Sequence, residues 1–201
     1  RTAYMQADNA TPTGEDIADS DETLVRLAAA HDQRSFRVLM HRHMPRAIRL
    51  AQRILNDPAD ADDVGQEAFV RVWNHAPAFD PGKARFTTWL YRIVVNLALD
   101  RSRDPRHRPI DDAANVAIPS PAPVDAMIAR EQEALLSAAI NHLSERQRAA
   151  IALFHMEGLS GREAANAMGM SEKAFESLLS RARHSLKQQL EQLEEDPRSL
   201  A

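Results

Sequence analysis

The chain contains no cysteine in its 201 residues. Disulfide bonds and thiolate metal ligands are therefore excluded, and nothing in the sequence requires an oxidising compartment. The chain also lacks any apolar run near the roughly 18 to 20 residues that span a bilayer. Its first 22 residues are polar and acidic, unlike a secretory signal with a basic start and an apolar core. We expect a soluble protein of the cytoplasm.

No stretch alternates polar and apolar residues as a half-buried strand does, and we find no internal repeat. Apolar residues instead recur every three or four positions, which is typical of helices packed on a core. The sequence therefore predicts an all-α fold. The expected helices cover 21–31, a long segment from about Phe36 to Asn56 that Pro45 kinks or interrupts, then 60–75, 87–102, 125–142, 144–157, 160–168 and 171–194.

Proline and small polar residues divide this pattern into two small helical domains. Residues 104–124 hold five prolines and no apolar stripe, which indicates a flexible linker. Residues 1–20 have low hydrophobicity and are expected to be a disordered tail. The predicted domains are therefore 21–103 and 125–194, with a second tail at 195–201.

Charge is distributed unevenly around a formal net charge of -4. Residues 31–53 hold six arginines against one acid, and residues 83–108 hold seven Lys or Arg against two acids. Between them, residues 57–67 carry five acids and no basic residue. A polyanion responds to the local field more than to the total charge. Such alternating patches suit a protein that contacts both DNA and a second protein.

Residues 158–183 have the features of a helix-turn-helix. Ser160 and Glu163 have the capping-box spacing that starts a helix. Gly169 follows at the position where the backbone after a helix often adopts a left-handed conformation, which costs glycine the least energy. Ser171 can then cap the next helix. A helix hairpin without DNA binding is the alternative for this segment taken alone.

The second of these helices has one apolar stripe and one polar face. The predicted buried stripe consists of Phe175, Leu178, Leu179, Ala182 and Leu186. The residues left facing outward are Lys173, Ser177, Ser180, Arg181 and His184. A recognition helix places this kind of polar, partly basic face in a DNA major groove.

Two long segments, one in each predicted domain, resemble a known family. The first domain contains DADDVGQEAFVRVW and FDPGKARFTTWLYRIVVNLALDR, from residues 60 and 79, and the second contains LSERQRAAIALFHMEGLSGREAANAMGMSEKAFESLLSRAR, from residue 143. With these motifs the chain resembles sigma factors of the extracytoplasmic-function (ECF) group, which keep only the second and fourth conserved sigma-70 regions. The resemblance covers about 22–103 and 125–190. It implies three partners: core RNA polymerase, promoter DNA and an inhibitory anti-sigma factor.

The resemblance implies that an acidic helix docks on the clamp helices of the large polymerase subunit. The residues concerned are Asp62, Asp63, Gln66 and Glu67. On sequence alone these acids form an uncompensated negative patch, and a solvated helix start is the alternative interpretation. The apolar residues beside them are expected to face the core: Phe69, Val70 and Trp73.

The loop and helix after residue 78 correspond to the family's reader of the minus-ten element, where DNA strands separate. A captured base needs apolar walls, hydrogen bonds to its edge and positive charge along the phosphates. The candidates are Phe79, Phe86 and Trp89 for walls, Lys83, Arg85 and Arg92 for phosphates, and Asn96 for a base edge. The alternative is that the aromatic residues belong to the core and the arginines are solvated.

In the second domain the recognition helix would read the minus-thirty-five element as duplex DNA. The candidate residues are Lys173, Ser177, Ser180, Arg181 and Arg183. The chain departs from the commonest family pattern at Glu176 and Leu178, where basic residues are usual. A glutamate weakens attraction to phosphates, yet it can accept a hydrogen bond from cytosine. A surface role without DNA contact is equally open for Glu176.

No constellation supports catalysis, a cofactor or a metal site. His41 and His43 lie two apart on a predicted helix, so they point to different faces and are expected at the surface. Asp111 and Asp112 lack a neighbouring nucleophile, phosphate loop or histidine ligand. Two other functions remain as alternatives: a dimeric helix-turn-helix repressor or activator with a helical sensor half, and an adaptor whose helices bind another protein.

Overall fold

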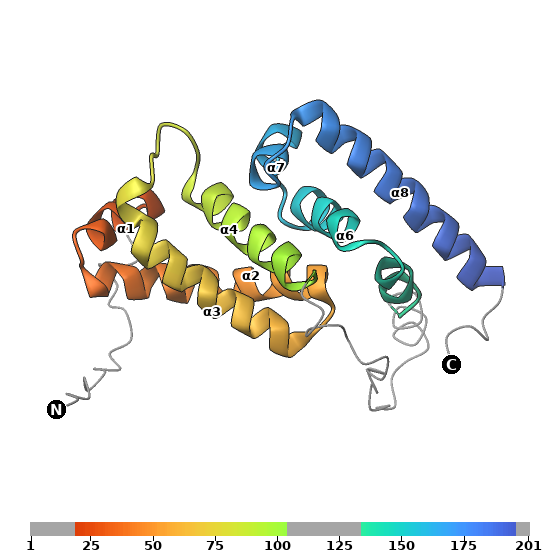
Figure 1. Cartoon of the computed structure of the whole chain (residues 1–201), viewed down its shortest axis with the longest axis horizontal. Helices are drawn as coiled ribbons and strands as arrows, with labels where there is room; N and C mark the ends of the chain where they lie inside the picture. The colour runs from red at the N-terminus through yellow and green to blue at the C-terminus, as the bar shows by residue number, and fades with distance from the viewer. Residues whose placement is uncertain (1–18, 104–133, 196–201) are drawn as a thin grey trace.

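The structure, a computed structural model, describes residues 19–103 and 134–195, which are coloured in Figure 1. Every regular element in these two ranges is a helix, so the predicted all-α fold is confirmed. The predicted linker 104–124, the tail up to residue 18, the start of the predicted helix 125–142 and residues 196–201 lie outside the described residues. Within the described ranges, no helix is both long and apolar enough to cross a membrane.

The first domain consists of α1 (Asp21–Ala29), α2 (Gln33–Leu55), α3 (Pro58–His75), the short 3-10 turn η1 (Ala76–Ala78) and α4 (Phe86–Arg101). Side chains cap the first three helices: the Ser20 hydroxyl accepts from the backbone of Thr23, and Asp32 and Asp57 cap α2 and α3. Ser20 therefore belongs to the folded domain, although the sequence predicted a disordered tail up to this residue.

The sequence predicted that Pro45 kinks or interrupts the second helix, and the interruption is wrong. α2 is assigned as helix without a break on both sides of Pro45. Proline removes one backbone hydrogen bond from a helix, here the one to the carbonyl of His41. Burial compensates for this loss, because the residues around the proline include the fully buried Ala47 and Leu50 on the face that packs against the other helices.

α2 and α3 pack closely at Gly65, which is buried within α3. A Cβ atom built on Gly65 would lie 2.5 Å from Cγ1 of Ile48 on α2. The absence of a side chain at this position therefore sets how near the two helices approach. The hydrophobic stripe of α2 is buried at that contact.

The second domain consists of a helix at residues 134–141, α6 (Glu145–Ile151), the π-helical turn η3 (Ala152–Met156), α7 (Gly161–Ala167) and α8 (Glu172–Glu195). Both capping boxes predicted from the sequence, at Ser144 and Ser160, are confirmed. Gly169 has a φ of +66°, the left-handed conformation expected at the turn. The Ser171 hydroxyl accepts from the backbone of Ala174 at 3.3 Å, as predicted.

The two domains pack against each other. α6 contacts α2, and α7 contacts α4. In Figure 1, α6 and α7 lie between α4 and the long α8. Buried apolar residues from both domains form one continuous core cluster, which includes Ile54 and Leu90 of the first domain and Leu153 and Phe175 of the second.

We predict that Gly65→Ala lowers the free energy of unfolding by about 1–3 kcal/mol, because the new methyl group overpacks the contact with Ile48. The higher helix propensity of alanine, about 1 kcal/mol, opposes this loss. Urea denaturation followed by circular dichroism measures the difference. The matched control is Gly161→Ala at the start of α7, where the nearest atom to the added Cβ is 3.8 Å away. A Gly65 variant as stable as the Gly161 variant contradicts the packing argument.

Candidate functional site

A cleft of about 320 Å³ lies where the loop before α4 meets the first turns of α4. Its lining consists of Ala78, Phe79, Asp80, Lys83, Ala84, Thr88, Trp89 and Arg92, together with Asn166 from α7. Asp80 organises the loop, because its carboxylate accepts from the backbone of Gly82 at 2.9 Å and pairs with Lys83 at 3.2 Å. The hydrogen bond from Gly82 lowers the pKa of Asp80, and Lys83 lowers it further.

Three aromatic rings form the apolar part of this site. The ring centroids of Phe79 and Trp89 are 5.2 Å apart, and both rings contact Phe86 at 6.1–6.3 Å. Phe79 and Trp89 are partly exposed and line the cleft, whereas Phe86 is fully buried. The sequence predicted Phe86 as a wall of the site. In the structure it lies beneath the other two rings and supports them, because it packs inside the core.

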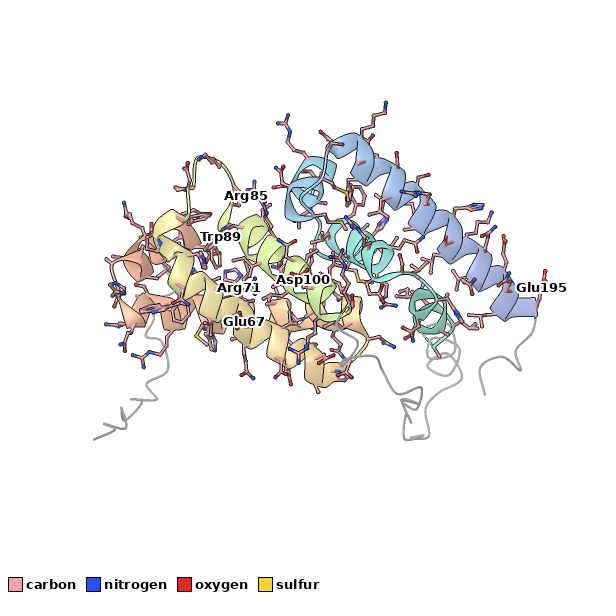
Figure 2. The ribbon with its side chains drawn as sticks, viewed as in Figure 1. Glu67, Arg71, Arg85, Trp89, Asp100 and Glu195 are labelled. Carbon is pink, nitrogen blue, oxygen red and sulfur yellow. The ribbon has the colours of Figure 1, made fainter. Side chains whose placement is uncertain are left out.

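The predicted polar residues divide into two groups. Lys83 and Arg92 line the cleft with their side chains exposed to solvent. Arg85 and Asn96 are exposed but do not line it. Figure 2 shows Arg85 and Trp89 at the same end of α4, where the loop enters the helix. The structure therefore brings together four of the seven predicted residues in one cleft.

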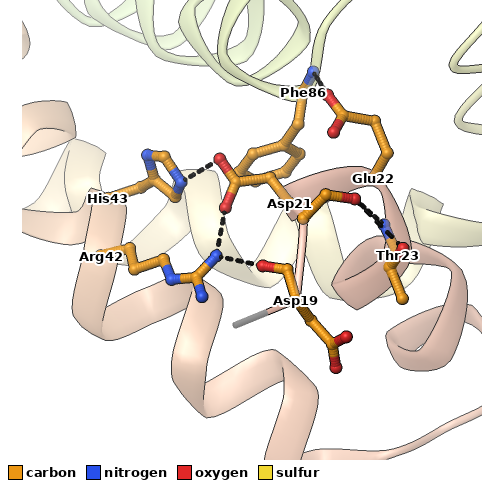
Figure 3. A network of polar contacts seen from close by, with 8 residues as sticks. Asp19, Asp21, Glu22, Thr23, Arg42, His43 and Phe86 are labelled. Carbon is orange, nitrogen blue, oxygen red and sulfur yellow. Dashed lines mark hydrogen bonds and ion pairs between the residues drawn. The ribbon is translucent and has the colours of Figure 1, made fainter. Parts of the chain in front are cut away.

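A polar network beneath the aromatic rings joins α1, α2 and α4 (Figure 3). Asp21 pairs with His43 Nε2 at 2.7 Å and with Arg42 at 2.9 Å. Glu22 accepts from the backbone of Phe86 at 3.4 Å, and the His43 ring packs edge-on against the Phe86 ring at 5.2 Å. This network fixes the start of α4, on which the cleft depends.

His43 is only 7% exposed, so the expectation that it lies at the surface is wrong. His41 is exposed, as predicted. Burial acts to raise the pKa of Asp21, but hydrogen bonds from His43 and Arg42 outweigh it and lower that pKa. The carboxylate of Asp21 is therefore ionised at neutral pH.

The predicted outward face of the helix-turn-helix is exposed on α8. Its exposed residues are Lys173, Ser177, Ser180, Arg181 and His184. Of the predicted buried stripe, Phe175, Leu179 and Ala182 are at most 5% exposed. Leu178 and Leu186 are only partly buried and pack against the core. Ser177 Oγ donates to the carbonyl of Lys173 at 3.0 Å, and Arg181 Nε donates to the carbonyl of Ser177 at 3.2 Å.

Arg183 occupies a different face of α8. It lies two residues after Arg181, which is about 200° around a helix. Its guanidinium donates to Nε2 of His155 at 3.2 Å and lies 5.3 Å from the centre of the Phe154 ring. Arg183 is therefore held against η3, on the opposite flank of the helix from Arg181.

The acidic residues of α3 are exposed, but their charge is partly compensated. Asp63 pairs with Arg101 at 2.6 Å, and Glu67 pairs with Arg71 at 3.0 Å. Figure 2 shows the Glu67 and Arg71 pair on α3. The description of this patch as uncompensated is therefore wrong, because α4 and the next turn of α3 supply two arginines.

The apolar neighbours of this patch do not all face the core. Phe69 is 1% exposed, as predicted, and Trp73 is partly buried against Phe36, with 4.8 Å between ring centroids. Val70 is 53% exposed, so its prediction as a core residue is wrong. Val70 lies on the α3 face that also carries Gln66, one turn earlier.

Sequence reasoning missed two residues of the cleft and one residue that joins the two domains. Thr88 is a buried polar residue of the cleft, Asn166 reaches its edge from the second domain, and Glu157 binds the first domain from the end of η3. The helical spacing of apolar residues around Thr88 does not indicate that Thr88 lines the cleft. Glu157 and Asn166 meet partners far away in the sequence, so no local pattern could reveal them.

Family models match both domains of the chain: "Sigma-70 region 2" over residues 39–108 and "Sigma-70, region 4" over residues 133–186. RNA polymerase sigma factor NccH of Alcaligenes xylosoxydans xylosoxydans is 38% identical over 83% of this chain and 92% of that protein. RNA polymerase sigma factor CnrH of Cupriavidus metallidurans is 33% identical over 84% and 93%.

Two solved structures share the fold. CnrH in complex with the cytosolic domain of CnrY matches with a TM-score of 0.64 and 32% identity, over 86% of this chain and 98% of that chain. The sigma factor RpoE in complex with the anti-sigma factor NepR from Bartonella quintana matches with a TM-score of 0.59 and 26% identity, over 79% and 98%.

We predict that Asp21→Asn lowers the free energy of unfolding at pH 7 by about 1–2 kcal/mol, because the ion pair with Arg42 is lost and the hydrogen bond with His43 is weakened. The folded-state pKa of Asp21 lies below its unfolded value of about 3.9. Its contribution is therefore complete above that value and disappears as the pH falls through the folded-state pKa. Urea titrations of both proteins between neutral and acidic pH measure the difference.

The matched control for this titration is Asp19→Asn, since only the backbone carbonyl of Asp19 contacts Arg42. Figure 3 shows the Asp19 carboxylate pointing away from the network. A stability difference between Asp21→Asn and the original chain that is the same at acidic and neutral pH rejects the electrostatic explanation.

Proposed function

This chain belongs to the extracytoplasmic-function group of the sigma-70 family of RNA polymerase sigma factors, and we propose that its α4 cleft captures a base of the minus-ten promoter element. The chain is an alternative sigma factor, a factor of transcription initiation. The observation that carries the proposal is the cleft itself, with aromatic walls and a cationic edge.

The chemistry of the cleft suits an unpaired base. Phe79 and Trp89 offer partly exposed rings on which a base can stack, a contact worth about 1–3 kcal/mol. Lys83 and Arg92 place positive charge at the edge, where the phosphates of a separated strand would pass. Asn96 lies one turn beyond Arg92 on the exposed face of α4 and extends this surface along the helix.

α8 is the proposed reader of the minus-thirty-five element. Ser177, Ser180 and Lys173 share its outer face, and Arg181 lies beside them. Serine and arginine can donate to base edges and phosphates in a major groove. Because Arg183 is fixed against His155 on another flank, we assign it to the DNA backbone rather than to a base.

The exposed acidic face of α3 is the proposed docking site for core polymerase. Asp62 and Gln66 are exposed there, and the pairs of Asp63 and Glu67 with arginine are themselves at the surface. Exposed ion pairs exchange partners at little cost, since they contribute at most about 1 kcal/mol. A basic helix of the polymerase can therefore replace Arg71 or Arg101 as the partner of these carboxylates.

We also propose that an anti-sigma factor controls this chain, because a solved relative was crystallised with one. RNA synthesis itself belongs to the polymerase, so we assign the chain no catalytic step. Its site of action follows from that of its partner, which transcribes DNA in the bacterial cytoplasm.

Transcription with purified core polymerase tests the proposal. On a genomic promoter of this factor, we expect Trp89→Ala to lower the transcript yield at least tenfold, because one aromatic wall for the captured base is lost. A template already melted at the minus-ten element restores part of the yield, since the cost of strand separation is removed. Trp89→Phe keeps a stacking surface and serves as the control.

Two outcomes contradict this role for the chain. One is equal transcription by Trp89→Ala and the original protein. The other is an absence of transcripts from every genomic promoter together with tight operator binding by the chain alone, which would identify a helix-turn-helix repressor or activator. Binding to a protein partner without any effect on transcription would identify an adaptor.

A second prediction concerns the polymerase-docking face. Asp62 forms no ion pair within the described residues, so Asp62→Lys changes the charge of the exposed α3 face without breaking an internal contact. We expect its affinity for core polymerase to fall about tenfold or more, because a like charge then faces the basic partner. Fluorescence anisotropy of the labelled chain measures this. Glu191→Lys, on exposed α8, is the control, and equal affinities of the two variants reject the assignment.

A further inference from the structure

A groove of about 480 Å³ lies between the start of α6 and the first turns of α8. These two helices pack against each other in the second domain (Figure 1). We call this cavity the α6–α8 groove. Arg181, a member of the proposed DNA-reading face of α8, is one of the residues that line it. The groove is therefore continuous with the surface that we assign to the minus-thirty-five element.

The wall formed by α8 and the turn before it is apolar. Met170 lies in that turn, Ala174 in the first turn of α8 and Leu178 in the second. Ala174 is exposed, whereas Met170 and Leu178 are partly buried and pack against the core. In a helix-turn-helix, the N-terminal residues of the second helix contact base edges. These apolar side chains therefore belong to the part of α8 that a major groove would receive.

The wall formed by α6 is polar and positively charged. Gln147 accepts from the hydroxyl of Ser144 at 3.0 Å and donates to the hydroxyl of Ser185 on α8 at 3.3 Å, so it links the two helices. Arg146 lines the groove with its side chain exposed. Among the described residues that line the groove, none is acidic. An anionic ligand would therefore meet Arg146 and Arg181 without a competing carboxylate in the lining.

Duplex DNA combines the two properties that this groove requires. Its phosphates are anionic, and the 5-methyl group of thymine presents an apolar contact at the base edges of the major groove. An acidic protein helix would match the charges as well. The position of Arg181 on both the groove and the DNA-reading face favours DNA as the occupant.

We propose that Leu178 and Ala174 bind a thymine methyl group of the minus-thirty-five element in the α6–α8 groove, while Arg146 binds a flanking phosphate. The proposal rests on the assignment of α8 to that element. At Leu178 the chain departs from the commonest family pattern, in which a basic residue is usual. An arginine can donate to guanine or to a phosphate, whereas a leucine side chain makes only apolar contacts. Leu178 is therefore a specificity-determining residue of this chain.

Uracil isolates this contact, because it pairs with adenine as thymine does but lacks the methyl group. The probe is a fluorescent duplex of a genomic promoter from which holoenzyme containing this chain makes transcripts. Each thymine of its minus-thirty-five element, on either strand, is replaced singly by uracil. Anisotropy then measures the affinity of holoenzyme reconstituted from the full chain and core polymerase. We expect at least one replacement to lower the affinity about fourfold, the effect of removing one buried methyl group.

Variants of the groove connect this effect to its residues. Leu178→Ala should bind the thymine and uracil duplexes equally, and Leu178→Met should retain the difference because its side chain is still apolar. Leu186→Ala is the matched control, since Leu186 is also a partly buried leucine of α8 but does not line the groove. Ala174→Gln places a polar side chain at an exposed position of the groove and gives a second test if Leu178→Ala fails to fold.

The phosphate contact has a different signature. Arg146→Gln should lower the affinity for the thymine and uracil duplexes by the same factor, because a phosphate contact does not depend on the base. It should also reduce the slope of log affinity against log salt concentration by about one. An unchanged slope overturns the assignment of Arg146.

Three results overturn the role of the groove. The first is equal affinity of the original chain for the thymine duplex and every uracil duplex. The second is a uracil effect that persists in both Leu178→Ala and Ala174→Gln, which places the methyl group on another surface. The third is a loss of affinity of Leu178→Ala for core polymerase without DNA, which identifies a protein as the occupant.

Replacement of the whole minus-thirty-five element separates this proposal from the function on which it rests. Unchanged affinity after that replacement rejects the assignment of α8 to the element. A fall in affinity after that replacement, combined with no effect of any uracil, rejects the α6–α8 groove alone.

Discussion

The arrangement of the whole molecule depends on one buried carboxylate that needs partners. The side chain of Glu157 is only 4% exposed, and a buried carboxylate without partners is costly. Arg46, Arg53 and Tyr91 provide it, and all three lie on α2 or α4 of the first domain. The position of the helix-turn-helix relative to the cleft follows from this contact and from the apolar core that continues across the boundary.

The residues that support the cleft are distinct from those that can contact a ligand. Phe86 and the network around Asp21 are buried beneath it and hold the first turn of α4 in place. Phe79 and Trp89 lie above them, partly exposed and available to a ligand. A recognition site requires this order, because exposed aromatic walls select a base only when the backbone beneath them is fixed. The same sequence motif therefore encodes both a core residue and its exposed neighbours.

Sequence reasoning succeeded where the physics is local. Capping at Ser160 and the left-handed turn at Gly169 depend on residues a few positions apart. It failed where partners are distant in the chain. Asp63 meets Arg101 across 38 positions, and Glu157 meets Arg46 across 111. No periodic pattern carries such pairings, because they arise only when helices pack. The prediction that Val70 faces the core failed for a related reason. Its apolar side chain suggests a buried position on α3, but the sequence does not show how far the neighbouring helices cover that face.

The most direct test of the account is a structure of this chain bound to core polymerase on a melted promoter. We expect a minus-ten base stacked on the exposed face of Phe79 or Trp89. A complex in which promoter DNA is bound and opened while no base contacts Phe79 or Trp89 would contradict the assignment of the cleft.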